Sequence, residues 1–320
     1  MELTLDEISA LGSVDVVIPT YKPGIKFTKL IDHLHRQTVA VRHIYVINTE
    51  EEYYNVSATD KYDDFIVTHI TKAEFDHGGT RNMGAKMSDA DFVLFMTDDA
   101  IPKNPHLVAE LLSPFANDNV AASFARQLGD KKADYLEYSI RCFNYPNESR
   151  LKTKEDIDEL GIKTFFCSNV CAMYRKSAYE EVGGFIREAI FNEDMQMAMS
   201  LIKAGYGVYY AADAKVVHWH KYSFMTQLHR NFDVAVSQAM MGGYLKDIKS
   251  EGEGKKMVKT VIKHLFKSGR IYLVPKLVIQ SGFKYIGYYL GRRYDKLPKW
   301  MVMKLTMNPS FFKKYYETKA

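Results

Sequence analysis

A short apolar run that ends beside two aspartates constrains the fold of this chain more than any other stretch. Residues 92–96, Phe-Val-Leu-Phe-Met, predict a strand buried on both faces, and Asp98 and Asp99 follow it after one residue. Such strands are typical of open α/β sheets, which bind ligands at the carboxyl ends of their strands. Proteins usually hold Mg²⁺ through one or two carboxylates and substrate phosphates. The stretch therefore predicts an α/β protein with a cation site, unless the two acids only form a turn or cap a helix.

Three earlier segments have the composition of further strands in the same sheet. Residues 14–18, 43–48 and 65–70 are rich in β-branched and aromatic side chains. Residues 27–34, with apolar side chains at helical spacing, separate the first two segments. This alternation predicts a parallel sheet with crossover helices, and residues 19–24 are expected to form a tight loop after the first strand.

A glycine-rich turn at residues 75–85 is a candidate anion site. Gly78 and Gly79 permit close backbone approach, and Arg81 is expected to open the helix that follows. A helix N-terminus with a cation beside it favours a phosphate ligand. The alternative is a plain turn in which Arg81 pairs with a surface acid.

Two later stretches carry further candidate groups. Glu193 and Asp194 stand at the predicted start of a helix, where acids complement the helix dipole. His218 and His220 follow a predicted strand at residues 215–217 and share one face of it. Two histidines near a suspected metal are candidate ligands or phosphate contacts, and a purely structural role is the alternative.

Together these stretches resemble the inverting family-2 glycosyltransferases with the GT-A fold, and their bacterial rhamnosyltransferase-like branch most of all. The resemblance covers about residues 14–230. The stretches that carry it, in the order of the family, are residues 16–21, 77–82, 97–100, 192–194 and 218–223. The resemblance implies a Rossmann-like, mostly parallel central sheet flanked by helices.

The resemblance also implies roles for single residues. The implied donor-binding residues are Pro19, Thr20, Tyr21, Asn48, His77, Arg81 and Asp98. Asn48 stands where the family usually has an aspartate, which leaves the nucleotide base open. Asp99 and His218 are implied to hold Mg²⁺ or Mn²⁺, and Asp194 is implied to be the general base, with Glu193 as its catalytic neighbour.

The chemistry of inverting transfer agrees with these roles. The acceptor hydroxyl needs a base on the face opposite the leaving group, and the departing nucleoside diphosphate needs a cation. We expect an enzyme that moves L-rhamnose from dTDP-rhamnose to a lipid-linked glycan in bacterial cell-surface polysaccharide synthesis. A sugar nucleotidyltransferase and a non-catalytic glycan- or lipid-binding module are the alternatives.

The charge of the chain is distributed unevenly. Residues 255–320 hold 16 Lys and Arg against two acids, whereas the preceding 254 residues hold 27 against 37. Apolar residues of 257–266 fall on one helical face among lysines, and residues 271–290 are aromatic and aliphatic. This pattern predicts interfacial helices on an anionic membrane. The alternatives are an apolar face packed on the protein itself, with solvated lysines, or a homodimer contact.

We therefore expect a GT-A catalytic domain over residues 1–228 and a basic, amphipathic helical region over residues 229–320. The polar residues 134–159 predict a mobile connection or an acceptor-facing loop. No signal peptide, run of about 18 apolar residues or nucleic-acid-binding motif is expected, and the three cysteines suit a reducing compartment. The predicted location is the cytoplasm, peripherally on the inner face of the membrane.

Overall fold

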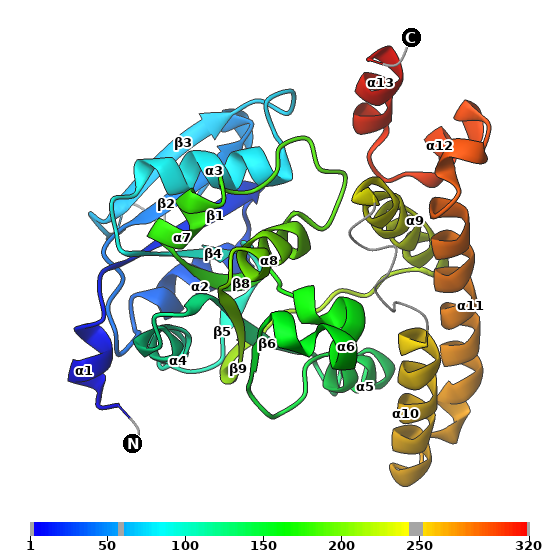
Figure 1. Cartoon of the computed structure of the whole chain (residues 1–320), viewed down its shortest axis with the longest axis horizontal. Helices are drawn as coiled ribbons and strands as arrows, with labels where there is room; N and C mark the ends of the chain where they lie inside the picture. The colour runs from blue at the N-terminus through cyan, green and yellow to red at the C-terminus, as the bar shows by residue number, and fades with distance from the viewer. Residues whose placement is uncertain (1–2, 57–60, 243–251, 319–320) are drawn as a thin grey trace. The chain divides into compact units, whose positions relative to one another are not determined.

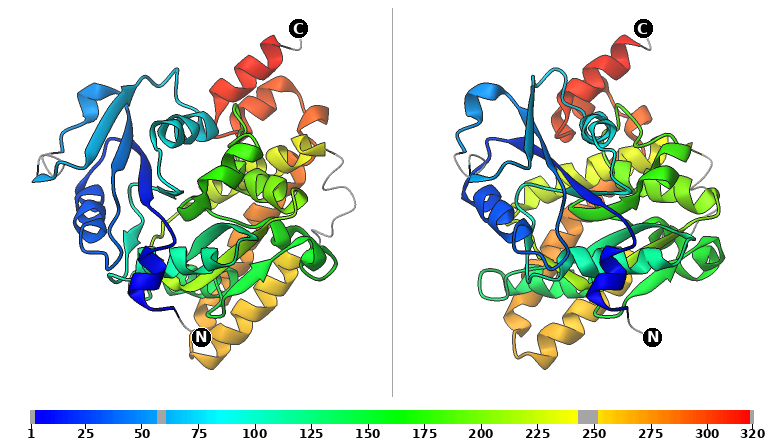
Figure 2. Two further views of the ribbon diagram at one scale, coloured as in Figure 1. Left: turned by 60° about the vertical axis from the view of Figure 1, so that its left-hand side comes forward. Right: turned by 90° about the vertical axis from the view of Figure 1, so that its left-hand side faces the viewer.

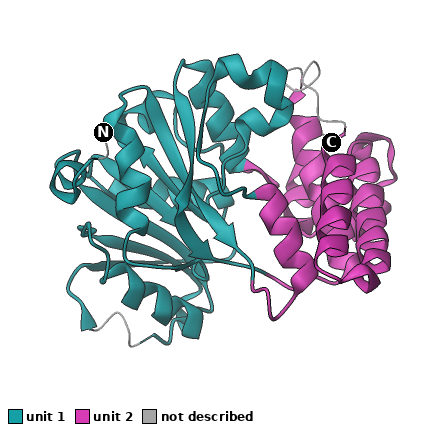
Figure 3. Ribbon diagram, turned by 90° about the horizontal axis from the view of Figure 1, so that it is seen from below, with its two compact units in different colours: residues 1–129, 145–187, 193–219 teal, residues 130–144, 188–192, 220–320 magenta. Residues whose placement is uncertain are grey.

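The computed structural model describes residues 3–56, 61–242 and 252–318, and these form two compact units (Figure 1, Figure 3). Unit 1 comprises residues 1–129, 145–187 and 193–219, and unit 2 comprises residues 130–144, 188–192 and 220–320. The chain thus enters unit 2 twice before it reaches residue 220. The expected domain boundary at residue 228 stays a prediction.

Unit 1 is built on one mixed β-sheet. Its strand order is β3-β2-β1-β4-β8-β6-β9-β5, and β7 also pairs with β9. β1 to β4 run parallel, β8 is antiparallel to β4 and β6, and β6 is parallel to β9. The strands are β1 (Val14–Tyr21), β2 (Ile44–Thr49), β3 (Phe65–Ile70), β4 (Phe92–Met96), β5 (Ile101–Pro102), β6 (Val120–Leu128), β7 (Arg150–Lys152), β8 (Cys171–Arg175) and β9 (Gly207–Val217). The predicted α/β class is confirmed, but β1 continues through Pro19 to Tyr21, where a loop was expected.

Helices cover both faces of this sheet (Figure 2). Val16 and Ile18 of β1 share a core with α2, whereas Val17 points to the opposite face and meets Gly84 of α3. A Cβ atom on Gly84 would lie 2.4 Å from Val17 Cγ1, so glycine lets α3 approach the strand. The helices are α1 (Leu5–Ser9), α2 (Ile25–Leu34), α3 (His77–Met87), α4 (Leu107–Leu112), α6 (Ile157–Leu160), α7 (Lys176–Glu181) and α8 (Glu193–Lys203).

Unit 2 is helical over its described residues. Its helices are α5 (Tyr135–Asn144), α9 (Phe224–Met240), α10 (Glu253–Lys267), α11 (Val274–Gly291), α12 (Lys299–Leu305) and α13 (Pro309–Glu317). α10 buries Val261 and Leu265 in a core that α5 shares. α11 packs on α9 through Gly287, where an added Cβ would lie 2.1 Å from the Leu228 carbonyl oxygen. None of the helices in the described part of the chain combines the length and apolarity needed to traverse a bilayer.

The loop expected over residues 134–159 was wrong. α5, β7 and α6 all fall within it. α5 buries Leu136, Ser139 and Ile140, a spacing of three and then one that puts them on one helical side. Only two of those residues are apolar, so the helical period was hidden among charged and aromatic neighbours.

Candidate functional site

Asp98 and Asp99 lie at the carboxyl end of β4, as predicted. A turn follows the strand, because the Ala100 N–H donates to the Thr97 carbonyl oxygen at 3.1 Å. Burial, followed by the charge of Asp99, raises the pKa of Asp98 to about 6. The Asp99 carboxylate lies 3.5 Å from Lys26 Nζ and 3.4 Å from His218 Nε2. The turn expected as an alternative is present, and it presents Asp99 to two side chains from other elements.

His218 follows β9 directly and is held on its other side by a buried amide. Residues 215–217 are the end of one long strand with a register irregularity rather than a separate strand. Gln127 Nε2 donates to Ser168 Oγ at 2.8 Å, so its oxygen Oε1 faces His218 Nδ1 at 3.0 Å. Nδ1 therefore carries a proton, and Nε2 is the ring nitrogen that faces Asp99.

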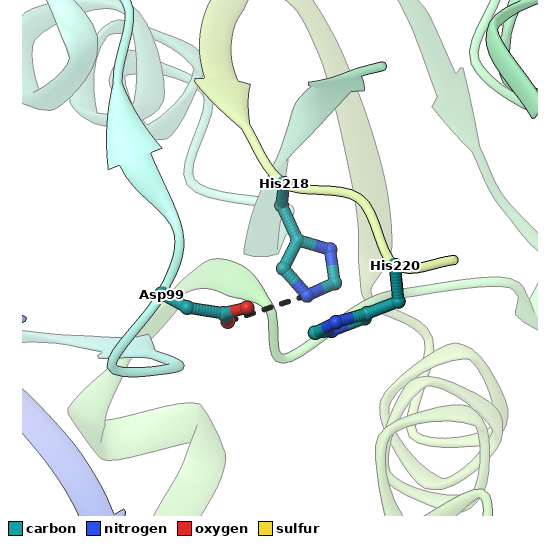
Figure 4. Close-up of side chains that lie close together, drawn as sticks. All are labelled: Asp99, His218 and His220. Carbon is teal, nitrogen blue, oxygen red and sulfur yellow. Dashed lines mark ion pairs between the residues drawn. The ribbon is translucent and has the colours of Figure 1, made fainter. Parts of the chain in front are cut away.

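Asp99 and His218 consequently face each other. Asp99 Oδ1 and His218 Nε2 lie 3.4 Å apart, which is an ion pair when the imidazole is protonated; when the imidazole is neutral, both atoms offer lone pairs to one point. The ligand atoms of Asp99, His218 and His220 all lie within 4.8 Å of one another (Figure 4). Carboxylate and imidazole are both metal ligands, so these residues fit a divalent cation.

Asp194 is anchored by backbone donors in the first turn of α8. The N–H groups of Met195 and Asn169 donate to its carboxylate at 2.8 and 3.3 Å. Burial, followed by the charge of Glu193, raises the pKa of Asp194 to about 7. A carboxylate that titrates near neutral pH is suited to accept a proton.

Asn169 is a site residue that the sequence did not single out. Its backbone N–H donates to Asp194, and its side-chain oxygen accepts from the Tyr174 hydroxyl at 2.8 Å. Its Nδ2 is buried without a hydrogen-bond partner among the described atoms. The residue follows Ser168, which receives the Gln127 hydrogen bond, so adjacent residues join the surroundings of Asp99 to those of Asp194.

The helix that Arg81 was expected to open begins earlier than predicted, and the anion site there stays a prediction. The helix begins at His77, one turn before Arg81. Asp76 caps it by accepting from the Gly79 N–H at 2.5 Å, so a carboxylate of the chain occupies the N-terminus. Arg81 Nη1 instead donates to Glu193 Oε1 at 3.1 Å, and both side chains are mostly buried. Arg81 is therefore linked to the surroundings of Asp194 by its ion pair with the preceding residue, Glu193.

The residues expected to bind the nucleotide lie along the carboxyl ends of β1 and β2. Pro19 pairs with Ile47 and Thr20 with Asn48 across the two strands. Asn48 is fully buried, accepts from Thr20 Oγ1 at 3.1 Å and lies 3.0 Å from His69 Nδ1. Its side chain thus bridges the ends of three neighbouring strands.

Tyr21 differs from these neighbours because it is exposed. Its ring packs edge-to-face on Tyr53 at 5.8 Å, and Lys72 Nζ lies 5.0 Å from the ring centre. Lys22 Nζ lies over the Tyr53 ring at 4.1 Å. Two rings with two cations suit a base and its phosphates. No local pattern in the sequence points to Tyr53 or Lys72.

A protein family and two curated relatives resemble this chain over much of its length. A model of glycosyl transferase family 2 matches residues 15–183. The chain is 36% identical over 287 residues to the O-antigen chain rhamnosyltransferase RfbN of Salmonella typhimurium (strain LT2), covering 89% of this chain and 91% of the relative. It is 37% identical over 293 residues to the O-antigen chain rhamnosyltransferase WbaN of Salmonella anatum, covering 90% and 92%.

Two solved structures share the fold. The mannosyltransferase PcManGT from Pyrobaculum calidifontis, in complex with GDP-Man and Mn²⁺, has a TM-score of 0.60 at 13% identity and covers 89% of this chain and 88% of its own. Residues 1–349 of S. aureus TarS give a TM-score of 0.53 at 14% identity, covering 89% and 91%. The predicted GT-A fold with a C-terminal helical region is confirmed.

Proposed function

We propose, from the premise that the chain belongs to glycosyl transferase family 2, that it is an inverting, metal-dependent rhamnosyltransferase of polysaccharide synthesis. Its activity as a glycosyltransferase follows from the family itself. Two relatives described as O-antigen chain rhamnosyltransferases, each similar over about nine-tenths of both chains, support L-rhamnose as the sugar. We take dTDP-rhamnose as the donor and a lipid-linked glycan as the acceptor.

The observation that carries the proposal is the pairing of Asp99 with His218. Gln127 orients the His218 ring so that, in the neutral imidazole, Nε2 and the Asp99 carboxylate present lone pairs to one point. We assign Asp99 and His218 as metal ligands, with His220 as a third candidate. The metal would supply a Lewis acid for the charge that develops on the leaving diphosphate. Imidazole ligands favour Mn²⁺ over Mg²⁺, which prefers oxygen atoms.

We assign Asp194 as the general base. Its pKa of about 7 lets the carboxylate exist at neutral pH and still accept a proton from an acceptor hydroxyl. The two backbone N–H groups that bind it fix its direction. Glu193 is held by Arg81, so we give Glu193 the role of raising the pKa of Asp194 and positioning Arg81 near the donor.

For the donor, we assign Tyr21 to the base and Lys72 to its phosphates. The exposed ring of Tyr21 offers a stacking face, whereas Thr20 and Asn48 hold the strand ends together. Pro19, His77 and Asp98 remain proposed donor contacts.

We further propose that the acceptor is reached at the inner face of a membrane. The support is the excess of 14 positive charges over residues 255–320, which suits an anionic lipid surface. A homodimer remains the competing use of the same region.

Product analysis tests the proposal. The protein is incubated with dTDP-rhamnose, Mn²⁺ and a lipid-linked saccharide, and the nucleotide products are separated. We expect dTDP to appear in step with the rhamnosylated lipid. Pyrophosphate as the product would identify a nucleotidyltransferase instead.

Two variants complete the experiment. Asp99→Ala should abolish transfer, and undiminished function would favour a non-catalytic binding module. Asp213→Ala is the matched control, because that acid is 69% exposed and pairs only locally with Lys215 in β9.

A further inference from the structure

α11 turns an apolar face to the solvent along most of its length. The exposed fractions are 55% for Val278, 48% for Ile279, 68% for Tyr285, 49% for Ile286 and 46% for Tyr289. These five residues, called the α11 face below, follow one another at spacings of one, six, one and three and so lie on one side of the helix. Every exposed residue of α11 is uncharged.

The charged residues of α11 lie on its inner side. Lys276 Nζ binds Asp134 Oδ2 at 3.1 Å. Burial lowers the pKa of Lys284. Gly287 and Gly291 bring the same side of the helix against the carbonyl oxygens of Leu228 and Phe232 in α9. α11 therefore departs from the usual polarity of a surface helix, because its exposed side is apolar as well as its packed side.

α10, in contrast, has the usual polarity of a surface helix. Val261 and Leu265 of α10 are buried with α5, and Met257, Val258 and Ile262 pack on the same core. Its lysines at 255, 256, 259, 263 and 267 are exposed. Most of the apolar side of α10, which the sequence suggested for a membrane, is thus covered by the protein itself, whereas Phe266 is 57% exposed.

We propose that the α11 face docks on an anionic lipid surface; this rests on the proposed function only in that the acceptor is lipid-linked. Exposed cations follow the face directly at Arg292 and Arg293, and the Arg293 guanidinium lies 3.8 Å from the centre of the Tyr289 ring. Tyrosine rings favour the boundary between lipid and water, and the arginines complement anionic headgroups.

Charge decides between a membrane and a second copy of the chain. Residues 255–320 hold 16 Lys and Arg against two acids, so a contact between two copies of this region would bring like charges together. An anionic bilayer instead compensates the charges around the face. A large exposed apolar surface rimmed by cations fits that partner best.

Vesicle binding by the full chain tests the proposal. The protein is sedimented with vesicles of phosphatidylcholine alone or mixed with phosphatidylglycerol, without donor or acceptor. We expect binding to the anionic vesicles, weakened by salt. The double variant Ile279→Ser and Ile286→Ser should lower the partition coefficient on the order of 10- to 100-fold. The matched control, Ile66→Ser and Ile186→Ser, removes two exposed isoleucines of unit 1 and should bind as the unchanged protein does.

Three outcomes would overturn the proposal. The first is that the double variant binds vesicles as strongly as the unchanged protein does. The second is that the protein binds both kinds of vesicle equally. The third is that light scattering shows a dimer which is lost in the double variant while its vesicle binding persists. Because the assay contains no nucleotide sugar, failure of the rhamnosyltransferase proposal leaves its result standing.

Discussion

The candidate site in unit 1 and the α11 face in unit 2 depart from ordinary protein structure in opposite directions. Unit 1 buries polar side chains: Asn48, Gln127 and Asn169 are each at most 4% exposed. Unit 2 exposes apolar ones, with Tyr285 at 68% and Ile286 at 49%. A buried polar group and an exposed apolar patch are the two departures that carry information, since the reverse placement is routine.

The difference indicates two kinds of function. A buried polar group destabilises a fold unless it is hydrogen-bonded, and Gln127 is held between His218 and Ser168. Such a group is retained where it orients another side chain. Apolar side chains that stay in contact with water do not stabilise the fold. A contiguous face of them is therefore retained where another surface binds it. Unit 1 is accordingly assigned the chemistry, and unit 2 the contact with lipid.

The largest expected effect distinguishes α10 from α11 in unit 2. Leu265→Ala in α10 should lower the free energy of unfolding by about 2–5 kcal/mol, because the side chain is fully buried. Ile286→Ala on the α11 face should change it by less than about 0.5 kcal/mol. Urea unfolding followed by circular dichroism measures both. Equal losses would show that the α11 face is covered in solution.

A smaller effect is expected in unit 1. Gln127→Leu removes the acceptor for His218 Nδ1 and should weaken Mn²⁺ binding by about 10- to 100-fold, as measured by calorimetry. The matched control is Gln238→Leu in unit 2. It removes the partly buried oxygen that accepts a hydrogen bond from the Tyr288 hydroxyl, and it should leave the affinity unchanged. Unchanged affinity in Gln127→Leu would remove this amide from the account of the metal site.

The smallest effect concerns pH. The proposed base must be deprotonated to act, and its pKa is raised to about 7. Turnover should therefore fall as the pH decreases through about 7, approaching tenfold per pH unit below it. Vesicle binding through the α11 face should show no such midpoint. A rate that is flat between about pH 5 and 7, or that rises as the pH decreases, would contradict the assignment of Asp194.

Local patterns predicted the strands of unit 1 well. β3 and β4 have the predicted bounds, because a continuous apolar run is a signal contained in the strand itself. The start of α3 was missed although Asp76 is a good N-cap residue. Glycine is unfavourable inside a helix, so Gly78 and Gly79 conceal the helix start.

Contacts across the sequence could not be predicted in the same way. Gln127 and His218 are 91 residues apart, and only the pairing of β6 with β9 brings them together. Likewise, the sequence shows that both sides of α11 are apolar but not which side α9 covers. Close packing at Gly287 decides that, and packing is a property of the folded unit.

The central claim is that Asp99 and His218 hold the cation while a different residue, Asp194, acts as the base. Asp194→Asn tests this claim most directly. The substitution preserves shape and removes the proton acceptor. With dTDP-rhamnose and Mn²⁺, the account predicts that kcat falls by about 10²- to 10⁴-fold. The dissociation constant of the donor should stay within about twofold, or about 0.4 kcal/mol. Loss of donor binding with turnover retained would contradict the account.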